Sequence, residues 1–283
     1  MNYIKSLKPL LDYTDSEIRD LARQVVTKGH VVLHEQKLTK QEHIEWCKRW
    51  GKMDRNEYFM NPEDAREISI VSGQRDENGK RIGMFGKDEL QWHQNGSARH
   101  QFEDCIVSLY CVEECVDTVF SICSQVDCFA DLPEERKEYF RQFDIKLDYV
   151  EDGIYSIVGN DTEEEMSPEH EINTGAWYYD EGVDRRPLVS KHHVDGREYL
   201  YFCVPFMVGA YKNGVELSEK EVEALCDELW DVLFNSKYMQ HHVFRRGDIL
   251  IMDQLHTIHR RSPIRFMDRM LWRTAFDYSN IKF

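Results

Sequence analysis

The apolar and polar positions of the first fifty residues follow helical spacing. Thr14 and Glu17 have the spacing of a capping box, and apolar residues recur every three or four positions after them. Gly29 ends this predicted helix, and the apolar run HVVLH that follows predicts a short strand. Thr39 and Glu42 form a second capping pair, which predicts a second helix.

From Cys105 onward the pattern changes to short apolar runs between polar turns, which is typical of β-strands. Residues 133–143 and a stretch after Ser218 keep helical spacing. Two hairpins are predicted, one from PLVSKHH and YLYFC, the other from HHVFRR and ILIMD around Gly247-Asp248. The run RMLWRTAFDY is expected to close the sheet. The whole pattern predicts an α+β, mostly β fold: a jelly-roll core, or double-stranded β-helix, with covering helices.

The domain organisation predicted from the sequence is simple. The chain of 283 residues has no repeat, no low-complexity tract and no Pro, Gly or Ser-rich linker. We therefore expect a single domain over residues 1–283. Residues 160–171 are acidic and polar, which predicts an exposed loop or a lid.

Composition excludes several classes of function. Lys and Arg number 36 against 52 Asp and Glu, giving a formal net charge of -16, which disfavours a nucleic-acid partner. The N-terminus lacks the apolar segment of a signal peptide, and no stretch is long enough for a membrane span. None of the eight Cys forms a C-x-x-C pair, so buried reduced thiols are expected. These features predict a cytoplasmic protein that acts on a small molecule. They do not decide between a monomer and a homo-oligomer.

Two segments carry candidate chemistry, QWHQNGSARH at 91–100 and GDILIMDQLHTIHRRSPIRFMDRMLWRTAF at 247–276. Each alone is a weak signal, because a lone His beside an aromatic residue more often makes a structural hydrogen bond than a metal ligand. Taken together, and in this order, they are informative.

The chain resembles the taurine dioxygenase family of Fe(II)- and 2-oxoglutarate-dependent oxygenases. Where that family has W-H-x-D-G-S-Y, this chain has WHQNGSA from Trp92, and where it has G-G-D-T, this chain has CVDT ending at Thr118. The family's P-L-V-R-x-H-P-x-T-G-R-x-x-L is matched by PLVSKHHVDGREYL. Where the family has W-x-P-G-D-x-x-x-W-D-N-x-x-x-x-H followed by R-x-x-x-R, this chain has Arg246-Gly247-Asp248, Asp253-Gln254, His259, Arg269 and Arg273. The agreement runs in order from about Thr39 to Phe276.

The resemblance implies the cofactors and the site. In this family two His and one carboxylate hold Fe(II), 2-oxoglutarate takes two open positions, and O2 takes the third. The implied metal ligands here are His93, His259 and the residue at position 95. Arg269 is implied to bind the far carboxylate of 2-oxoglutarate, for which a guanidinium is suited, with Thr118 assisting. Arg273 would bind 2-oxoglutarate or a substrate anion, and alternation along a strand places it on the side of Arg269.

The chain departs from the family at its third ligand, where Asn95 stands in place of Asp. An amide oxygen can coordinate Fe(II), more weakly than a carboxylate. One interpretation is an oxygenase in which Asn95 ligates or flanks the iron and the product is a hydroxylated small polar metabolite. A second is a halogenase, in which the third position is open to a halide. A third is a pseudo-enzyme that binds metal or ligand without turnover. Deamidation at Asn95-Gly96 to supply a carboxylate is a further hypothesis.

Two residues near the first motif are candidates for the substrate side of the site. Ala98 replaces the aromatic residue common in the family, which would reshape the substrate pocket, and His100 is a candidate substrate contact. The net charge favours an amine-bearing substrate and Arg273 an anionic one, and an amino acid would satisfy both. His256 is expected to pack rather than ligate. The pairs His192-His193 and His241-His242 are expected at ordinary strand positions.

Overall fold

The computed structural model describes residues 1–5, 8–53, 61–85, 89–95, 105–114, 118–147, 185–203, 207–265 and 269–283. The expected lid at 160–171 and the candidate substrate residues Ala98 and His100 lie outside these ranges. Among the described residues, no helix combines the length and the apolar character needed to cross a membrane.

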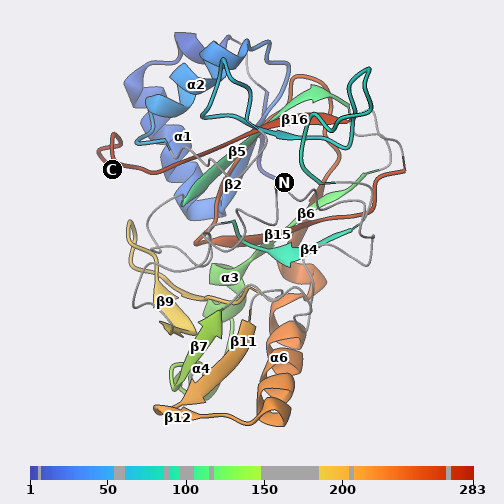
Figure 1. Ribbon diagram of the computed structural model, residues 1–283. Helices are drawn as coiled ribbons and strands as arrows, with labels where there is room; N and C mark the ends of the chain where they lie inside the picture. Colours follow the sequence, from blue (N-terminus) through green and yellow to red (C-terminus); the bar gives the residue numbers. More distant parts are fainter. Residues whose placement is uncertain are drawn as a thin grey trace.

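The larger sheet has six strands. Its order is β1 (Tyr3–Ile4), β2 (His30–Leu33), β14 (Ile249–Asp253), β5 (Ile106–Glu113), β16 (Met270–Phe276) and β3 (Ser69–Val71). All neighbours pair antiparallel except β1 with β2, which pair in parallel. The strands from the two ends of the chain therefore lie side by side with β5 from its middle (Figure 1).

A second sheet of four antiparallel strands completes the double-stranded β-helix. Its order is β13 (Met239–His242), β6 (Phe120–Ser124), β15 (Thr257–Arg261) and β4 (Leu90–His93). The inner faces of the two sheets share one buried apolar cluster, to which Phe120 and Ile122 contribute from the small sheet, and Val107 and Leu250 from the large one. This arrangement confirms the predicted jelly-roll core.

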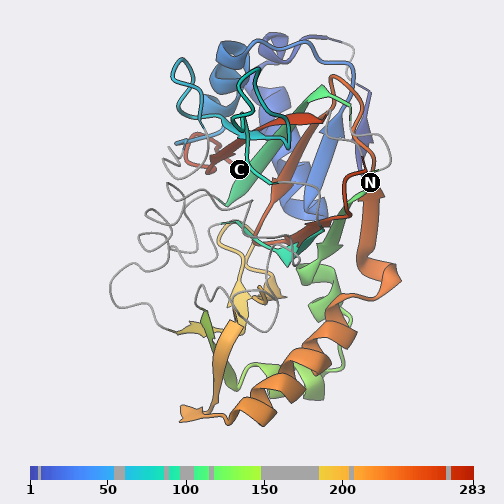
Figure 2. The ribbon, with the colours of Figure 1, turned by 45° about the vertical axis from the view of Figure 1, so that its right-hand side comes forward.

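Two helices, α1 (Asp15–Lys28) and α2 (Lys40–Lys48), cover the outer face of the larger sheet, as Figures 1 and 2 show. On α2, the His43 Nε2 lies 3.0 Å from the Ser108 hydroxyl of β5, and the Cys47 thiol 3.2 Å from the Thr274 hydroxyl of β16. Both predicted capping boxes are present, and Gly29 ends α1 with a left-handed φ of 80°. Local sequence signals thus set the helices that support the sheet from outside.

Most of the remaining elements lie at the other end of the molecule (Figure 2). A third sheet has the order β12 (Val215–Glu216), β11 (Met207–Lys212), β7 (Phe143–Leu147) and β8 (Arg186–Pro187). The predicted hairpin of β9 (Val189–Lys191) and β10 (Glu198–Leu200) is confirmed. The helical elements of this end are α3 (Gln125–Ala130), α4 (Glu134–Phe140), α6 (Glu219–Leu233) and η3 (Ser236–Tyr238). The short helix η1 (Leu10–Asp12) instead contacts α2.

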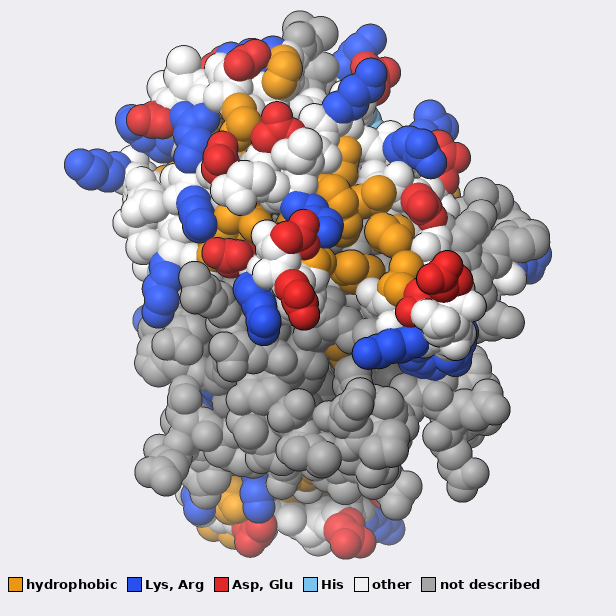
Figure 3. Space-filling view, turned by 45° about the horizontal axis from the view of Figure 1, so that its top comes forward, with side chains coloured by type: hydrophobic (Ala, Val, Ile, Leu, Met, Phe, Trp, Pro, Cys, Tyr) orange, Lys and Arg blue, Asp and Glu red, His pale blue; other side chains and the backbone are white. Residues whose placement is uncertain are grey.

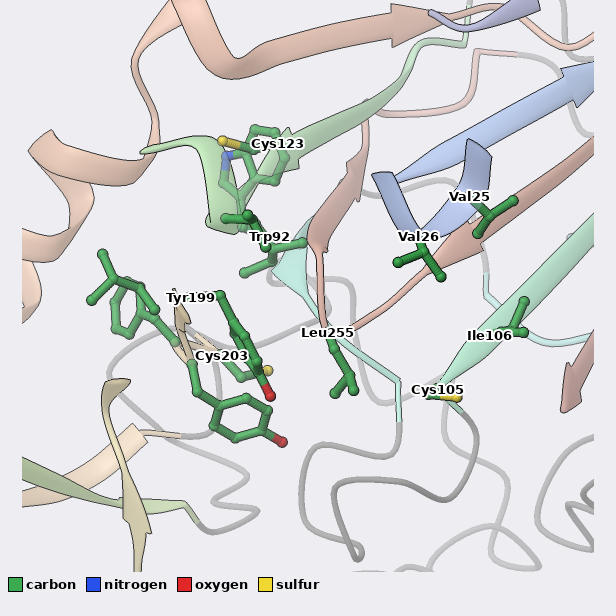
Figure 4. Close-up of a cluster of buried hydrophobic side chains, with 14 of the residues drawn as sticks. Val25, Val26, Trp92, Cys105, Ile106, Cys123, Tyr199, Cys203 and Leu255 are labelled. Atoms are coloured by element: carbon green, nitrogen blue, oxygen red, sulfur yellow. The ribbon is translucent and has the colours of Figure 1, made fainter. Parts of the chain in front are cut away.

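The turn between β14 and β15 lies at a meeting point of the core. Leu255, on this turn, lies between Trp92 and Cys203 on one side and Val26 of α1 on the other (Figure 4).

The surface at the end of the molecule that carries α1 and α2 has acidic and basic side chains around a hydrophobic area (Figure 3). The net negative charge therefore forms no patch of a single sign on that face.

Three details of the predicted fold were wrong. HHVFRR and ILIMD do not form a hairpin: β13 pairs with β6 in the small sheet, whereas β14 pairs with β2 and β5 in the large one. The chain changes sheet at Gly247, as a jelly roll requires. The helix expected to reach Phe143 ends at Phe140, because Phe143 already begins β7. Helix α3, capped by Ser124, was not predicted.

Candidate metal centre

The two His predicted as metal ligands lie directly opposite each other on neighbouring strands. His259 of β15 is the antiparallel partner of His93 at the end of β4. Their ring centroids are 4.3 Å apart, and each residue is only 4% exposed. Opposed residues on antiparallel strands point to the same face of a sheet, so the two imidazoles converge.

Hydrogen bonding sets the orientation of His93. Its Nδ1 lies 2.6 Å from the carbonyl oxygen of Gln91, which can only accept, so Nδ1 carries the proton and Nε2 keeps its lone pair. The ring of His259 stacks on Phe120, with centroids 5.4 Å apart at 28°. A metal-ligating His is commonly held through its second nitrogen in this way, so His93 fits a metal ligand.

The side chain of Asn95 reaches the same place. Its amide nitrogen is 3.5 Å from the Nε2 of His259. The oxygen and nitrogen of an Asn carboxamide are distinguished by their hydrogen bonds, and a rotation of the group about the Cβ–Cγ bond would bring the oxygen to this position. Within the described ranges, no group of three His, Cys, Asp or Glu has the geometry of a metal site. Two imidazoles and one carboxamide are therefore the donors that converge here.

Burial keeps both imidazoles neutral. It lowers the pKa of His93 to about 4; the Gln91 carbonyl opposes this shift, and the charges of Arg261 and Arg273 add to it. The pKa of His259 lies well below its ordinary value, again mainly through burial, with contributions from His93 and Arg273. Neutral imidazoles with lone pairs at pH 7 are what a divalent cation requires.

The residues predicted to bind 2-oxoglutarate are all buried: Thr118 is 2% exposed, Arg269 3% and Arg273 4%. Arg273 lies two residues from both Leu271 and Ala275 on β16, so it shares their face of the sheet and points between the two sheets. Arg269 precedes β16, whose pairing with β5 is irregular between Met270 and Leu271. Because of this irregularity, the orientation of Arg273 does not by itself determine to which face of the sheet Arg269 points.

Arg261 is a further buried cation that the sequence analysis did not select. It is 2% exposed and lies two residues after His259 on β15, opposite Phe120 of the inner cluster. Alternation along the strand from His259 was the signal that could have identified it.

A buried ion pair supports the turn before the second His. His192 Nε2 is 2.9 Å from the Asp253 carboxylate, which also accepts a hydrogen bond from the Tyr278 hydroxyl at 2.7 Å. The other Asp253 oxygen accepts the backbone N–H groups of Leu255 and His256, at 2.8 and 3.1 Å. The expectation of an ordinary strand position for His192 was wrong, because the residue lies just past β9 and both ring nitrogens have partners. Its Nδ1 accepts the backbone N–H of Val194 at 3.3 Å.

His256 packs as expected. Its Nδ1 is 2.9 Å from the Val26 carbonyl and its Nε2 2.9 Å from the Ser124 hydroxyl. Both ring nitrogens are thus used in joining the turn to α1 and β6, and neither points to the paired His93 and His259.

Comparison with known proteins agrees with this geometry. Residues 5–275 match the family described as "Taurine catabolism dioxygenase TauD, TfdA family". The chain belongs to this family. The chain is also similar to the alpha-ketoglutarate-dependent 2,4-dichlorophenoxyacetate dioxygenase of Burkholderia sp. (strain RASC). It is 24% identical over 262 residues, covering 87% of this chain and 80% of the relative.

Solved structures of TauD-like proteins share the fold. A taurine dioxygenase from Burkholderia xenovorans has a TM-score of 0.71 at 16% identity, over 98% of this chain and 89% of the other. AAD-2, solved with Mn(II) and N-oxalylglycine, has the same TM-score and identity, over 98% and 93%. Family membership confirms the predicted class, a 2-oxoglutarate-dependent dioxygenase, and with it Fe(II), 2-oxoglutarate and O2 as its cofactors and co-substrates.

Proposed function

We propose that His93, His259 and the carboxamide oxygen of Asn95 hold Fe(II), and that the protein hydroxylates a small polar metabolite with an anionic group. The observation that carries the proposal is the convergence of these three side chains. The two rings lie 4.3 Å apart, and the Asn95 carboxamide lies 3.5 Å from the Nε2 of His259. When bound, iron with 2-oxoglutarate and O2 supplies the oxidation of a C–H bond.

The side chains around the centre would bind and orient 2-oxoglutarate. Arg269 would pair with its far carboxylate, and the buried Thr118 hydroxyl, which makes no hydrogen bond to a described residue, would donate to the same group. A buried hydroxyl without a partner costs free energy, and a bound carboxylate would remove that cost.

The charge of the site supports an anionic substrate. His, His and Asn are neutral ligands, so Fe(II) with a 2-oxoglutarate dianion carries no net charge, whereas a carboxylate ligand would leave it at minus one. Arg261 and Arg273 are both close enough to shift the pKa of His93. The positive charge of these two buried side chains would attract an anionic group on the substrate. The negative net charge alone would favour an amine, but Arg261 and Arg273 are the charges beside the predicted ligands.

The position of Asn95 bears on the halogenase interpretation. A halide would need the space beside His259 Nε2, and the carboxamide occupies it. The oxygenase is therefore the better-supported function.

Succinate formation from 2-oxoglutarate tests the proposal. We expect Fe(II)-dependent succinate release that rises when small carboxylate or sulfonate metabolites are added. His93→Ala should abolish it, while His241→Ala, which changes an exposed His bonded to Ser121, should not. Absence of succinate with every substrate, with Fe(II) present, would leave the pseudo-enzyme interpretation. A product mass that depends on chloride would instead establish the halogenase.

A further inference from the structure

Two of this chain's departures from the family's ligand motifs lie in contact. Asn95 replaces the motif's Asp, and Gln254 replaces the Asn that follows Asp253 in the motif W-D-N. In the structure the backbone N–H of Asn95 donates to the side-chain oxygen of Gln254 at 2.6 Å. Two residues that lie far apart in the chain and both differ from the family's motifs are therefore joined by one hydrogen bond.

Gln254 is itself held at several points. Its backbone N–H donates to the Cys105 carbonyl at 2.8 Å, and its own carbonyl accepts the side-chain N–H of Gln94. The same Gln94 amide donates to the side chain of Gln125 at 2.6 Å. Gln94, Gln125 and Gln254 are 2%, 0% and 3% exposed. These buried carboxamides link the segment after His93 to the turn before His259.

Such a network can position a ligand. Hydrogen bonds between buried groups are strong in a low-dielectric interior, and a buried donor that loses its acceptor carries the full cost of desolvation. Fixing the backbone nitrogen of Asn95 fixes the direction of its Cα–Cβ bond, and so the place of its carboxamide. A neutral amide oxygen attracts Fe(II) less than a carboxylate does, so it depends more on being placed correctly.

We propose that Gln254 is a positioning residue for Asn95, and that the two residues form a coupled pair in which the longer glutamine compensates for the weaker ligand. The effect of Gln254 on Fe(II) affinity rests on the function proposed above. The positioning of the Asn95 backbone by Gln254 does not depend on that function. Gln254 acts through Asn95 and is not itself placed at the metal.

Amide hydrogen exchange in the metal-free protein tests the hold on Asn95. By NMR, we expect Gln254→Ala to speed exchange of the Asn95 amide by at least about ten-fold, since its acceptor is lost. The matched control is Gln36→Ala, which removes another buried glutamine, bonded to the His34 carbonyl at 3.0 Å, and should leave the Asn95 amide unchanged. Unchanged Asn95 exchange in folded Gln254→Ala and in the conservative Gln254→Asn would overturn the proposal.

Fe(II) affinity in a double-mutant cycle tests the coupling. In the wild-type background, which has Asn95, Gln254→Asn should weaken Fe(II) binding about five-fold, the effect of losing one buried hydrogen bond. In the Asn95→Asp background the same substitution should weaken Fe(II) binding less than about two-fold, because a carboxylate binds the metal without this help. Equal effects in both backgrounds would contradict the coupling. If the wild-type protein bound no Fe(II), the proposed function would fail, and the exchange result alone would decide whether Gln254 holds Asn95.

Discussion

His192 and Asp253 form an ion pair of 2.9 Å whose side chains are completely buried, joining the β9–β10 hairpin to the turn between β14 and β15. Tyr278 adds a third contact to the same carboxylate. Because that turn leads directly into the strand that carries His259, the pair links the outer hairpin to the proposed metal centre.

Removing the charge of Asp253 is expected to destabilise the fold. Asp253→Asn should lower the free energy of unfolding by about 3 kcal/mol, because it leaves the buried His192 without its counter-charge. Urea unfolding at pH 6 measures this. The control is Asp131→Asn, which breaks the exposed ion pair with Lys237 and should cost less than about 1 kcal/mol. Equal losses of unfolding free energy in the two variants would show that the buried pair stabilises the fold no more than the exposed one.

The same pair predicts a pH dependence of stability. Burial alone would lower the pKa of His192, but the Asp253 carboxylate raises it above its ordinary value. Burial would raise the pKa of Asp253, but His192 and Tyr278 lower it to about 2. The Asp253 contribution is complete above about pH 4 and lost toward pH 2; the His192 contribution is complete below about pH 6.5 and lost as pH rises through its raised pKa.

The stability difference between the wild type and Asp253→Asn should therefore be largest between about pH 4 and 6.5 and should shrink on either side. Unfolding curves measured from pH 3 to 9 would show this. A difference that stays constant over the whole range would mean that the pair is not ionised.

Arg269 is expected to determine the affinity for 2-oxoglutarate. Arg269→Ala should raise the Kd for 2-oxoglutarate roughly ten- to one-hundred-fold, the loss of a charge-assisted pair of hydrogen bonds. Calorimetric titration with Fe(II) bound gives this Kd. Arg265→Ala, an exposed cation on the preceding loop, should leave it unchanged. A normal Kd in Arg269→Ala would transfer the role to Arg273 or Arg261.

Restoring the family's carboxylate should strengthen metal binding. Asn95→Asp is expected to tighten Fe(II) binding by at least about ten-fold, because an anionic oxygen replaces a neutral one at the metal. Competition with a chromophoric chelator measures the change. Asn235→Asp, at the cap of η3, is the matched control and should have no effect. If Asn95→Asp left the Fe(II) affinity unaltered, residue 95 would not be a ligand.

Local patterns predicted the helices, whereas strand partners needed the folded chain. The capping boxes at Thr14 and Thr39 act within one turn, so the sequence alone identifies them. The supposed hairpin around Gly247 failed because a tight turn of this kind can join two strands of one sheet or send the chain to another. Which of the two occurs depends on β6 and β2, which are distant in sequence.

The same distinction holds for the site. The ordered motifs singled out His93 and His259 as candidate ligands, and the structure places the two residues opposite each other. The contact of Gln254 with Asn95 joins a turn to a strand end, so no spacing in either segment could have indicated it. The buried pair of His192 with Asp253 is tertiary in the same sense.

The most direct test of the proposed metal centre is anaerobic titration of the metal-free protein with Fe(II) and 2-oxoglutarate, followed by the visible charge-transfer band of the chelate. We predict a band that saturates at one Fe(II) per chain and is lost in His93→Ala and His259→Ala but kept in His241→Ala. Failure to form the band in the wild type, with neither Fe(II) nor 2-oxoglutarate bound, would contradict the assignment of His93, His259 and Asn95 as an iron site.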